Sequence, residues 1–316
     1  MLNLLRRGAP AFESLSPAAG WRAPDDAIWL DLVNPTREEE LAVEAALGVE
    51  LPTSEEMAQI EPSSRLYQEN GATFMTATLL SRRDEGPKDV PVTFVLTKGR
   101  LVDIRYDELR AFSVFAARAP ASGLASGSAL LLGLLDAVIE RLAAALEETG
   151  ANVEAASVAI FQKGAGKRYD DLLADLARAQ SVTSKTRTSL VSVARVLSFG
   201  GLAPEIASDP ECSAHLQSLQ KDAQSLTEHA GFQSTHTSFL LDAALGLINI
   251  EQNSIIKFFS VVAVVFMPPT LVASIYGMNF HHMPELSWEF GYPMALAIML
   301  ATAVLPVLWF KRRGWF

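Results

Sequence analysis

The stretch Met267–Pro293, MPPTLVASIYGMNFHHMPELSWEFGYP, is the most informative part of the sequence for the C-terminal part of the chain. It begins inside one apolar segment and ends at the start of a second. Between them lie the triplet Gly277-Met278-Asn279, two histidines and Glu285. The amide of Asn279 needs a physical explanation, because the apolar segments on either side are long enough to lie in a bilayer.

Two uncharged segments flank this polar stretch. Phe258–Tyr276 and Phe290–Phe310 are each close to the ~20 residues that span a hydrocarbon core. Lys257 precedes the first segment and a basic run at 311–313 follows the second, whereas the short loop between them has no Lys or Arg. The positive-inside rule therefore predicts cytoplasmic N- and C-termini. The alternative is a pair of buried helices in a soluble protein.

Composition supports a protein with a membrane part and an acidic soluble part. The chain has 316 residues, a mean hydropathy of +0.20 and a formal net charge of −10. The acidic excess disfavours nucleic acid as a partner and suits cations. Cys212 is the single cysteine, which excludes a disulfide framework and a thiolate metal cluster. The early arginines of MLNLLRRGAP exclude a signal peptide, so the first 250 residues are expected not to cross a membrane.

Residues 1–120 carry the patterns of a mixed α and β domain. AIWLDLV, Ala27–Val33, alternates as a strand does. Thr36 and Glu39 form a capping box for a helix that runs to Gly48. Two hairpins are predicted, one with Asn70-Gly71 at its turn and one with Lys98-Gly99.

Long helices are expected after the Gly- and Ser-rich junction at 119–128. The first runs over 129–162 and is ended by Gly164 and Gly166, and the second runs over 167–199. Asp209-Pro210 opens a third helix, which is expected to continue into the first membrane segment. Its heptad stripe comprises Leu216, Leu219, Ala223, Leu226, Ala230, Gln233, Thr237, Leu240, Ala244 and Leu247. A bundle within one chain can bury this stripe, but self-association is favoured, since a helix cannot cover its own stripe.

Two membrane helices cannot enclose a pore, so transport would require an oligomer. Small and polar positions follow the first membrane segment at helical spacing: Asn253, Ser260, Ala263, Met267, Thr270 and Ser274. This face either lines an axis or packs against lipid and other helices, where small residues are also common.

The motif YGMNF at 276–280, followed by MPEL at 283–286 and FGYP at 290–293, resembles the CorA family of divalent-cation channels. Asn253, the stretch VVFMPPT and the order of an α/β part before long helices also resemble the family. In the first 200 residues the likeness is one of architecture only.

The resemblance implies a funnel-shaped homopentamer in the bacterial inner membrane. It implies an α+β cytosolic domain with α/β/α layers, long helices and two C-terminal transmembrane helices. Such proteins take up Mg²⁺, and also Co²⁺ and Ni²⁺, driven by the membrane potential. Mg²⁺ is then substrate and regulatory ligand, and no cofactor is expected. The sequence contains neither a phosphate-binding loop of the Walker type nor a Ser/His/Asp arrangement, so an enzyme is not expected.

By the same resemblance, Gly277, Met278 and Asn279 form the selectivity filter at the outer mouth. The pore-lining residues would be Asn253, Ile256, Phe259, Ala263, Met267, Thr270 and Ser274. Asp242 would help bind regulatory Mg²⁺ between subunits. Glu285 in the loop either attracts cations to the mouth or merely shapes the turn. A solvated helix face is the alternative for Asp242, and a helix C-cap is an alternative or additional role for Asn279.

Three features depart from the commonest family pattern: Pro269 after Pro268, Ser274 in place of glycine, and the pair His281-His282. Imidazoles bind Zn²⁺, Ni²⁺ and Co²⁺ well, although a solvated loop explains the pair more simply. A Zn²⁺ transporter of the same superfamily and a non-conducting, membrane-anchored divalent-cation sensor therefore stay open as alternatives.

The predicted division of the chain follows from these patterns. It comprises a cytosolic α/β domain at 1–120, antiparallel helices at 121–206, a stalk helix at 207–257, a pore-lining membrane helix at 258–280, a periplasmic loop at 281–289, a second membrane helix at 290–310 and a basic tail at 311–316.

Overall fold

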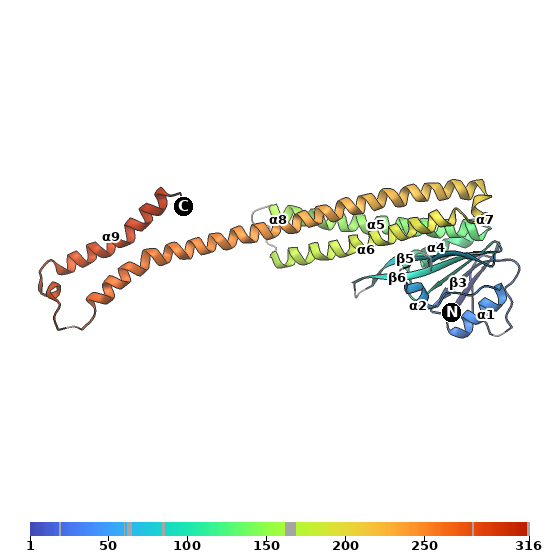
Figure 1. Cartoon of the computed structure of the whole chain (residues 1–316), viewed down its shortest axis with the longest axis horizontal. Coiled ribbons are helices and arrows are strands. Elements are labelled where there is room, and N and C mark those ends of the chain that lie inside the picture. Colours follow the sequence, from blue (N-terminus) through green and yellow to red (C-terminus); the bar gives the residue numbers. More distant parts are fainter. Residues whose placement is uncertain are drawn as a thin grey trace. The chain divides into compact units, whose positions relative to one another are not determined.

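The computed structural model describes residues 1–18, 20–59, 61, 65–83, 86–161, 169–279 and 281–314. The chain forms two compact units, Met1–Leu241 and Asp242–Phe316. Figure 1 shows the order of the elements along the chain. The expected end of the first long helix, at Gln162, Gly164 and Gly166, lies outside the described residues, as does Phe280 of the motif.

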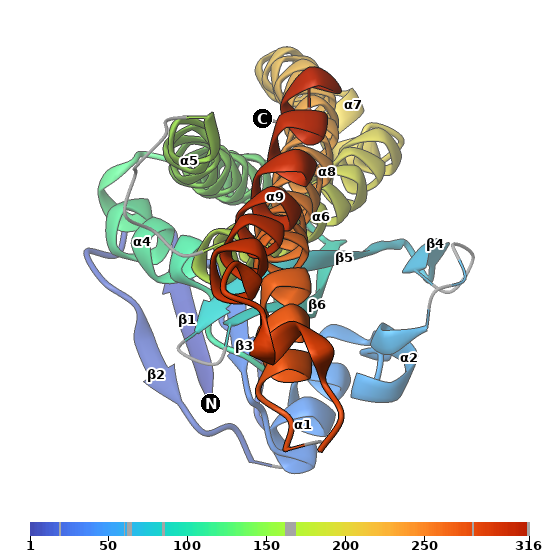
Figure 2. The ribbon, with the colours of Figure 1, turned by 90° about the vertical axis from the view of Figure 1, so that its left-hand side faces the viewer.

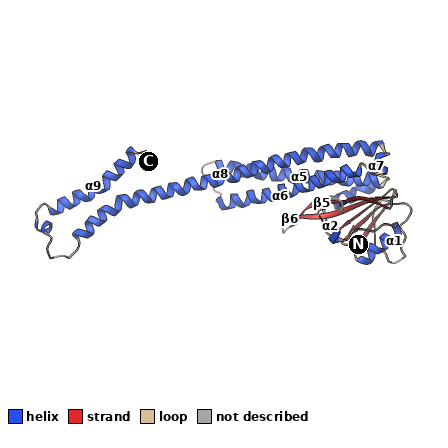
Figure 3. Ribbon diagram, in the orientation of Figure 1, coloured by secondary structure: helices blue, strands red, loops and turns tan. Residues whose placement is uncertain are grey.

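A seven-stranded sheet forms the first unit's centre, in the order β2-β1-β3-β7-β6-β5-β4 (Figure 3). The strands are β1 Leu2–Arg6, β2 Glu13–Leu15, β3 Ala27–Val33, β4 Leu66–Glu69, β5 Ala72–Arg83, β6 Gly86–Thr97 and β7 Arg100–Arg105. Neighbours are antiparallel except β3 and β7, which run parallel.

The two hairpins predicted from the sequence are both present. Asn70 and Gly71 join β4 to β5, and Lys98 and Gly99 join β6 to β7. All four residues have positive φ, between 50° and 76°. Two successive left-handed residues match the twist of the flanking strands, which is why Asn-Gly pairs favour such turns.

Helices cover both faces of this sheet (Figure 2). On one face lie α1 Arg37–Leu47 and α2 Ser54–Ala58, and α1 starts with the predicted Thr36–Glu39 capping box. On the other face lie α4 Arg110–Arg118, α5 Gly127–Phe161 and α6 Tyr169–Gly200. Two separate apolar cores result, one centred on Val43 and Leu30, the other on Phe94 and Leu130. This is the α/β/α layering expected for the domain.

Helix α5 begins directly against the β6–β7 turn. The backbone N–H of Gly127 donates to the carbonyl of Gly99 at 2.9 Å. A Cβ at Gly127 would lie 2.3 Å from the carbonyl carbon of Arg100, so only glycine allows this approach. Short elements complete the unit: η1 Ala119–Ala121 follows α4, and α7 Pro204–Ala207 follows α6.

Helix α8, Pro210–Tyr276, starts as predicted, with the Asp209 carboxylate accepting from the N–H groups of Glu211 and Cys212. The expectation that self-association covers its stripe is wrong for the first unit. Leu216, Leu219, Ala223, Ala230, Gln233, Thr237 and Leu240 are buried within the single chain. Gln233 Nε2 donates to the α5 carbonyl of Leu146 at 3.3 Å, and Gln180 of α6 donates to Ser234 at 2.8 Å. Helices α5 and α6 are both long and each contacts α8, so together they cover the stripe.

The second unit holds the rest of α8, the short η2 Pro284–Ser287 and α9 Gly291–Arg312. Helices α8 and α9 each contain an 18-residue stretch with a mean hydropathy of 2.1. In α8 none of this stretch is buried, and in α9 6% of it is buried. Both helices are therefore long and apolar enough to cross a membrane, and neither is a buried core helix. The observed helix ends leave 277–290 between them, a longer connection than the loop predicted at 281–289.

Candidate functional site

The polar triplet begins where α8 ends. Gly277 donates its N–H to the carbonyl of Ala273 at 2.9 Å, and Met278 donates to Ile275 at 3.3 Å. Asn279 lies three residues past the helix end and is exposed. It is therefore not the C-cap of α8. No described residue hydrogen-bonds to its side-chain amide, so both the carbonyl oxygen and the NH₂ group are available to a ligand or its water shell.

The expected pore positions lie on one side of the last part of α8. The seven residues, each exposed in the single chain, are Asn253, Ile256, Phe259, Ala263, Met267, Thr270 and Ser274. Their spacing of three and four residues places them on one helix face. The structure thus aligns them, and it leaves them uncovered within one chain.

Near the prolines of α8, the local hydrogen bonds leave oxygen atoms free to accept hydrogen bonds from water. The hydroxyl of Thr270 donates to the carbonyl of Phe266 at 2.7 Å. With its proton engaged in this way, the hydroxyl oxygen keeps lone pairs that can accept from the waters of a hydrated cation. Pro268 and Pro269 lie inside the helix and have no N–H. The carbonyls four residues earlier therefore lack their usual amide donors, and they too can accept from water.

The proposed regulatory and loop residues lie apart from the triplet. Asp242 is exposed on α8, roughly 50 Å along the helix from Tyr276 at ~1.5 Å per residue. Glu285 is exposed in η2, and His281 and His282 are exposed in the connection that precedes it. No three His, Cys, Asp or Glu side chains of the described residues gather into a metal site.

Sequence reasoning missed a buried charged cluster in the first unit. Arg105 Nη1 forms ion pairs with both Asp31 and Asp103, and Trp29 Nε1 donates to Asp103 at 2.6 Å. Burial, with the nearby Asp31, raises the pKa of Asp103 well above its ordinary value. The signal was the spacing of Asp103 and Arg105, two residues apart and so on one face of an otherwise apolar strand.

Known proteins resemble this chain over most of its length. Residues 24–312 match the family described as CorA-like Mg²⁺ transporter protein. The magnesium transport protein CorA of Salmonella typhimurium is 39% identical over 293 residues, which cover 92% of each chain. The CorA of Escherichia coli K12 is 38% identical over the same length. The chain belongs to the CorA family. Members of this family are Mg²⁺ transporters rather than enzymes, as the sequence predicted.

Solved structures confirm the fold. The complete CorA of Methanocaldococcus jannaschii matches with a TM-score of 0.76 at 18% identity, covering 100% of this chain and 99% of that one. Full-length CmaX matches with a TM-score of 0.71 at 13% identity, covering 98% and 97%. The ZntB cytoplasmic domain of Vibrio parahaemolyticus is more distant, with a TM-score of 0.57 at 10% identity over 79% of this chain and 98% of that domain.

Proposed function

We propose that the chain forms a homopentameric channel in the bacterial inner membrane that admits Mg²⁺ to the cytoplasm, with both termini cytoplasmic. One observation carries this proposal: the exposed amide of Asn279, which no described residue hydrogen-bonds, lies three residues past the end of a membrane-length helix in a member of the CorA family. Mg²⁺ gives up its octahedral water shell reluctantly. An amide carbonyl accepts hydrogen bonds from those waters without removing them, and a neutral group releases the ion again.

The oligomer is supported by what one chain leaves exposed. Two membrane helices per chain cannot enclose an axis, whereas several copies of α8 can. On the stalk part of α8, Phe232 and Phe239 lie seven residues apart on one face and are 71% and 59% exposed. Large apolar side chains in such a row indicate a surface that another chain covers.

The exposed face of α8 would line the axis from Asn253 to the filter at Gly277, Met278 and Asn279. Asn253 and Thr270 would form polar rings, and Ile256, Phe259 and Met267 apolar constrictions that close by losing water. Ala263 and Ser274 would keep the lumen wide between them. Glu285 would raise the local concentration of cations at the mouth.

No bound cofactor or chemical step is needed to drive uptake. Each elementary charge that crosses ~100 mV gains about 2.3 kcal/mol, so a divalent cation gains roughly twice that. We propose Co²⁺ and Ni²⁺ as secondary substrates of the same pore, because they are divalent and also hydrated.

Flux through the purified protein tests the function. We expect wild-type protein in liposomes with a negative interior to take up Mg²⁺ when internal Mg²⁺ is low, and to take up Co²⁺ more weakly. Zn²⁺ uptake without Mg²⁺ uptake would replace this proposal with a Zn²⁺ transporter. Absence of any divalent flux, with the oligomer intact, would leave a membrane-anchored sensor.

Asp242 is proposed to bind regulatory Mg²⁺ together with carboxylates of a neighbouring subunit. Without the ion these acidic groups repel each other, so Mg²⁺ would hold the closed state together. For Asp242→Ala we expect uptake to continue at internal Mg²⁺ concentrations that close the wild type, with the inhibiting concentration raised about tenfold. Asp25→Ala, the same change at an exposed loop residue, should close normally. Unchanged inhibition in Asp242→Ala would contradict the assignment.

A further inference from the structure

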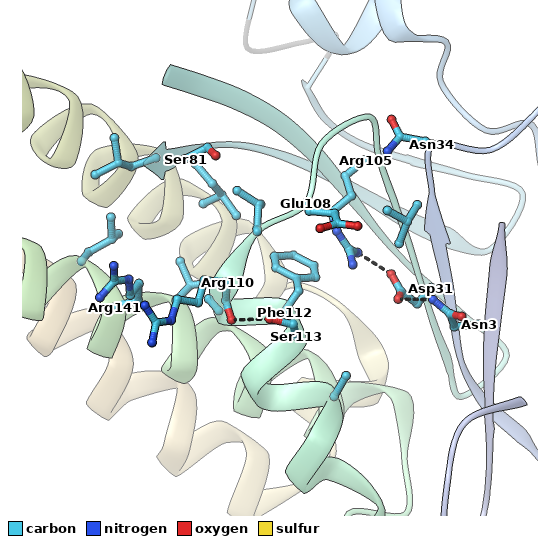
Figure 4. A pocket seen from close by; sticks show the side chains of 18 of the residues that line it. Asn3, Asp31, Asn34, Ser81, Arg105, Glu108, Arg110, Phe112, Ser113 and Arg141 are labelled. Carbon is cyan, nitrogen blue, oxygen red and sulfur yellow. Dashed lines mark hydrogen bonds and ion pairs between the residues drawn. The ribbon is translucent and has the colours of Figure 1, made fainter. Parts of the chain in front are cut away.

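A large cavity lies in the first unit between the sheet and helices α4 and α5 (Figure 4). Its volume is about 1090 Å³. Ligand pockets for small organic molecules are typically ~300–1,000 Å³, so this cavity exceeds what a single ion needs. Asp242 and the pore residues belong to the other unit, and the cavity has no part in the transport proposal.

Three arginines line this cavity. Arg110 is the first residue of α4 and Arg141 lies in α5, two helices that pack against each other. No carboxylate of the described residues pairs with either guanidinium, and Figure 4 shows both on the same side of the cavity. Two guanidinium groups on one side of the cavity offer planar, bidentate donors that suit a phosphate.

Arg105 forms the deep end of the cavity. It is only 5% exposed, and its guanidinium lies 4.1 Å from the ring centroid of Phe112. Its Nη1 is bound by Asp31 and Asp103, but its buried Nε has no hydrogen-bond partner. A buried donor without a partner costs free energy, so an acceptor supplied by a ligand or its water would be favourable here.

The start of α4 adds a positive end to the same wall. Leu109 occupies the N-cap and provides no side-chain cap, and the first turn, residues 110–113, lines the cavity. Uncapped N–H groups and the helix dipole favour an anion at this place. Two carboxylates also line the cavity: Asp31 is bound by Arg105 and Asn3, and Glu108 is exposed. Because Arg105 is neutralised by Asp31 and Asp103, the positive charge that this part of the structure offers a ligand comes from Arg110 and Arg141.

The rest of the lining is mixed: Asn3, Asn34 and Ser81 are polar, and a group of apolar side chains lies beside them. This apolar wall includes Leu79, Leu109, Phe112, Val138 and Leu142. We propose that the cavity binds a phosphate monoester with an apolar or aromatic body, such as a nucleoside monophosphate. The phosphate would lie between Arg110, Arg141 and the start of α4, and the body would extend along the apolar wall toward Arg105. A phosphate monoester carries up to two negative charges and three terminal oxygens, so it matches two arginines and a helix start better than a singly charged carboxylate does.

The test is calorimetric titration of the full-length protein in detergent with AMP, without Mg²⁺. We expect saturable binding at one site per chain, and binding at least about tenfold weaker in the double variant Arg110→Gln/Arg141→Gln. Both side chains reach solvent, so the variant should fold, which circular dichroism checks. The matched control Arg22→Gln/Arg187→Gln removes the same charge at exposed sites outside the cavity and should bind like wild type.

Adenosine and inorganic phosphate, titrated separately, distinguish the parts of the ligand. Both should bind more weakly than AMP. Equal binding of phosphate and AMP would overturn the role of the apolar wall. No saturable AMP binding, or binding unchanged in Arg110→Gln/Arg141→Gln, would overturn the site itself. Absence of AMP binding is the result expected if carboxylates of a neighbouring subunit occupy the two arginines in the assembled protein, and it would overturn the proposal.

Discussion

Replacing Asn279 with alanine is expected to lower Mg²⁺ uptake at least about tenfold while leaving the oligomer intact. The side chain is exposed past the end of α8 and has no described partner, so its loss should not disturb the fold. Each net hydrogen bond contributes about 0.5–1.5 kcal/mol, and an oligomer loses one acceptor from every subunit. The lower end of that range, summed around a ring, already exceeds the ~1.4 kcal/mol that corresponds to a tenfold change.

Uptake into liposomes with a negative interior, together with the elution volume of the purified oligomer, measures this effect. Asn152→Ala is the matched control, because Asn152 is an exposed asparagine of α5 far from the membrane helices in sequence. Asn279→Asp should also slow uptake, since a ring of carboxylates holds a divalent cation too tightly to release it. Wild-type flux in Asn279→Ala would remove the triplet from the pathway.

Replacing Arg105 with methionine is expected to destabilise the first unit by about 3–5 kcal/mol. The change leaves Asp31 and Asp103 buried without their common cation. For a unit of this size, such a loss corresponds to a melting temperature lower by roughly 6–20 °C. Thermal unfolding of the full-length protein in detergent, followed by circular dichroism, gives the shift. Arg187→Met, at an exposed site of α6, should have little effect.

Two further measurements separate charge from packing in this cluster. Burial and the nearby Asp31 raise the pKa of Asp103 in the folded protein. Protonation of this carboxyl therefore contributes stability at low pH, and this contribution is lost as the pH rises through that pKa. Without Arg105 the pKa should rise further, and the defect of Arg105→Met should shrink as pH falls. Adding Asp31→Asn and Asp103→Asn should restore much of the stability, because no buried charge is then left unpaired. If neither lower pH nor the two added substitutions reduced the loss of stability in Arg105→Met, that loss would come from packing alone.

The amino-acid sequence was sufficient to predict several local elements and the family. Thr36 and Glu39 cap a helix, Asn70-Gly71 turns a hairpin, and Asp209 starts α8, because each of these needs only a few neighbouring residues. Long uncharged segments and the Gly277-Met278-Asn279 triplet likewise lie within continuous stretches. They therefore predicted two membrane-length helices and a CorA-type protein, both of which the comparisons and the structure confirm.

Tertiary structure alone decided which surfaces are covered. The stripe of α8 has the pattern of a self-associating helix, yet α5 and α6 bury it within one chain. Asp31 and Arg105 are 74 residues apart and meet only because β3 and β7 are parallel neighbours. Arg110 and Arg141 share a cavity only because α4 packs on α5. A heptad stripe needs another apolar surface and a buried charge needs an opposite charge, and both needs can be read from the sequence. Which segment meets the need depends on the topology that brings distant segments together.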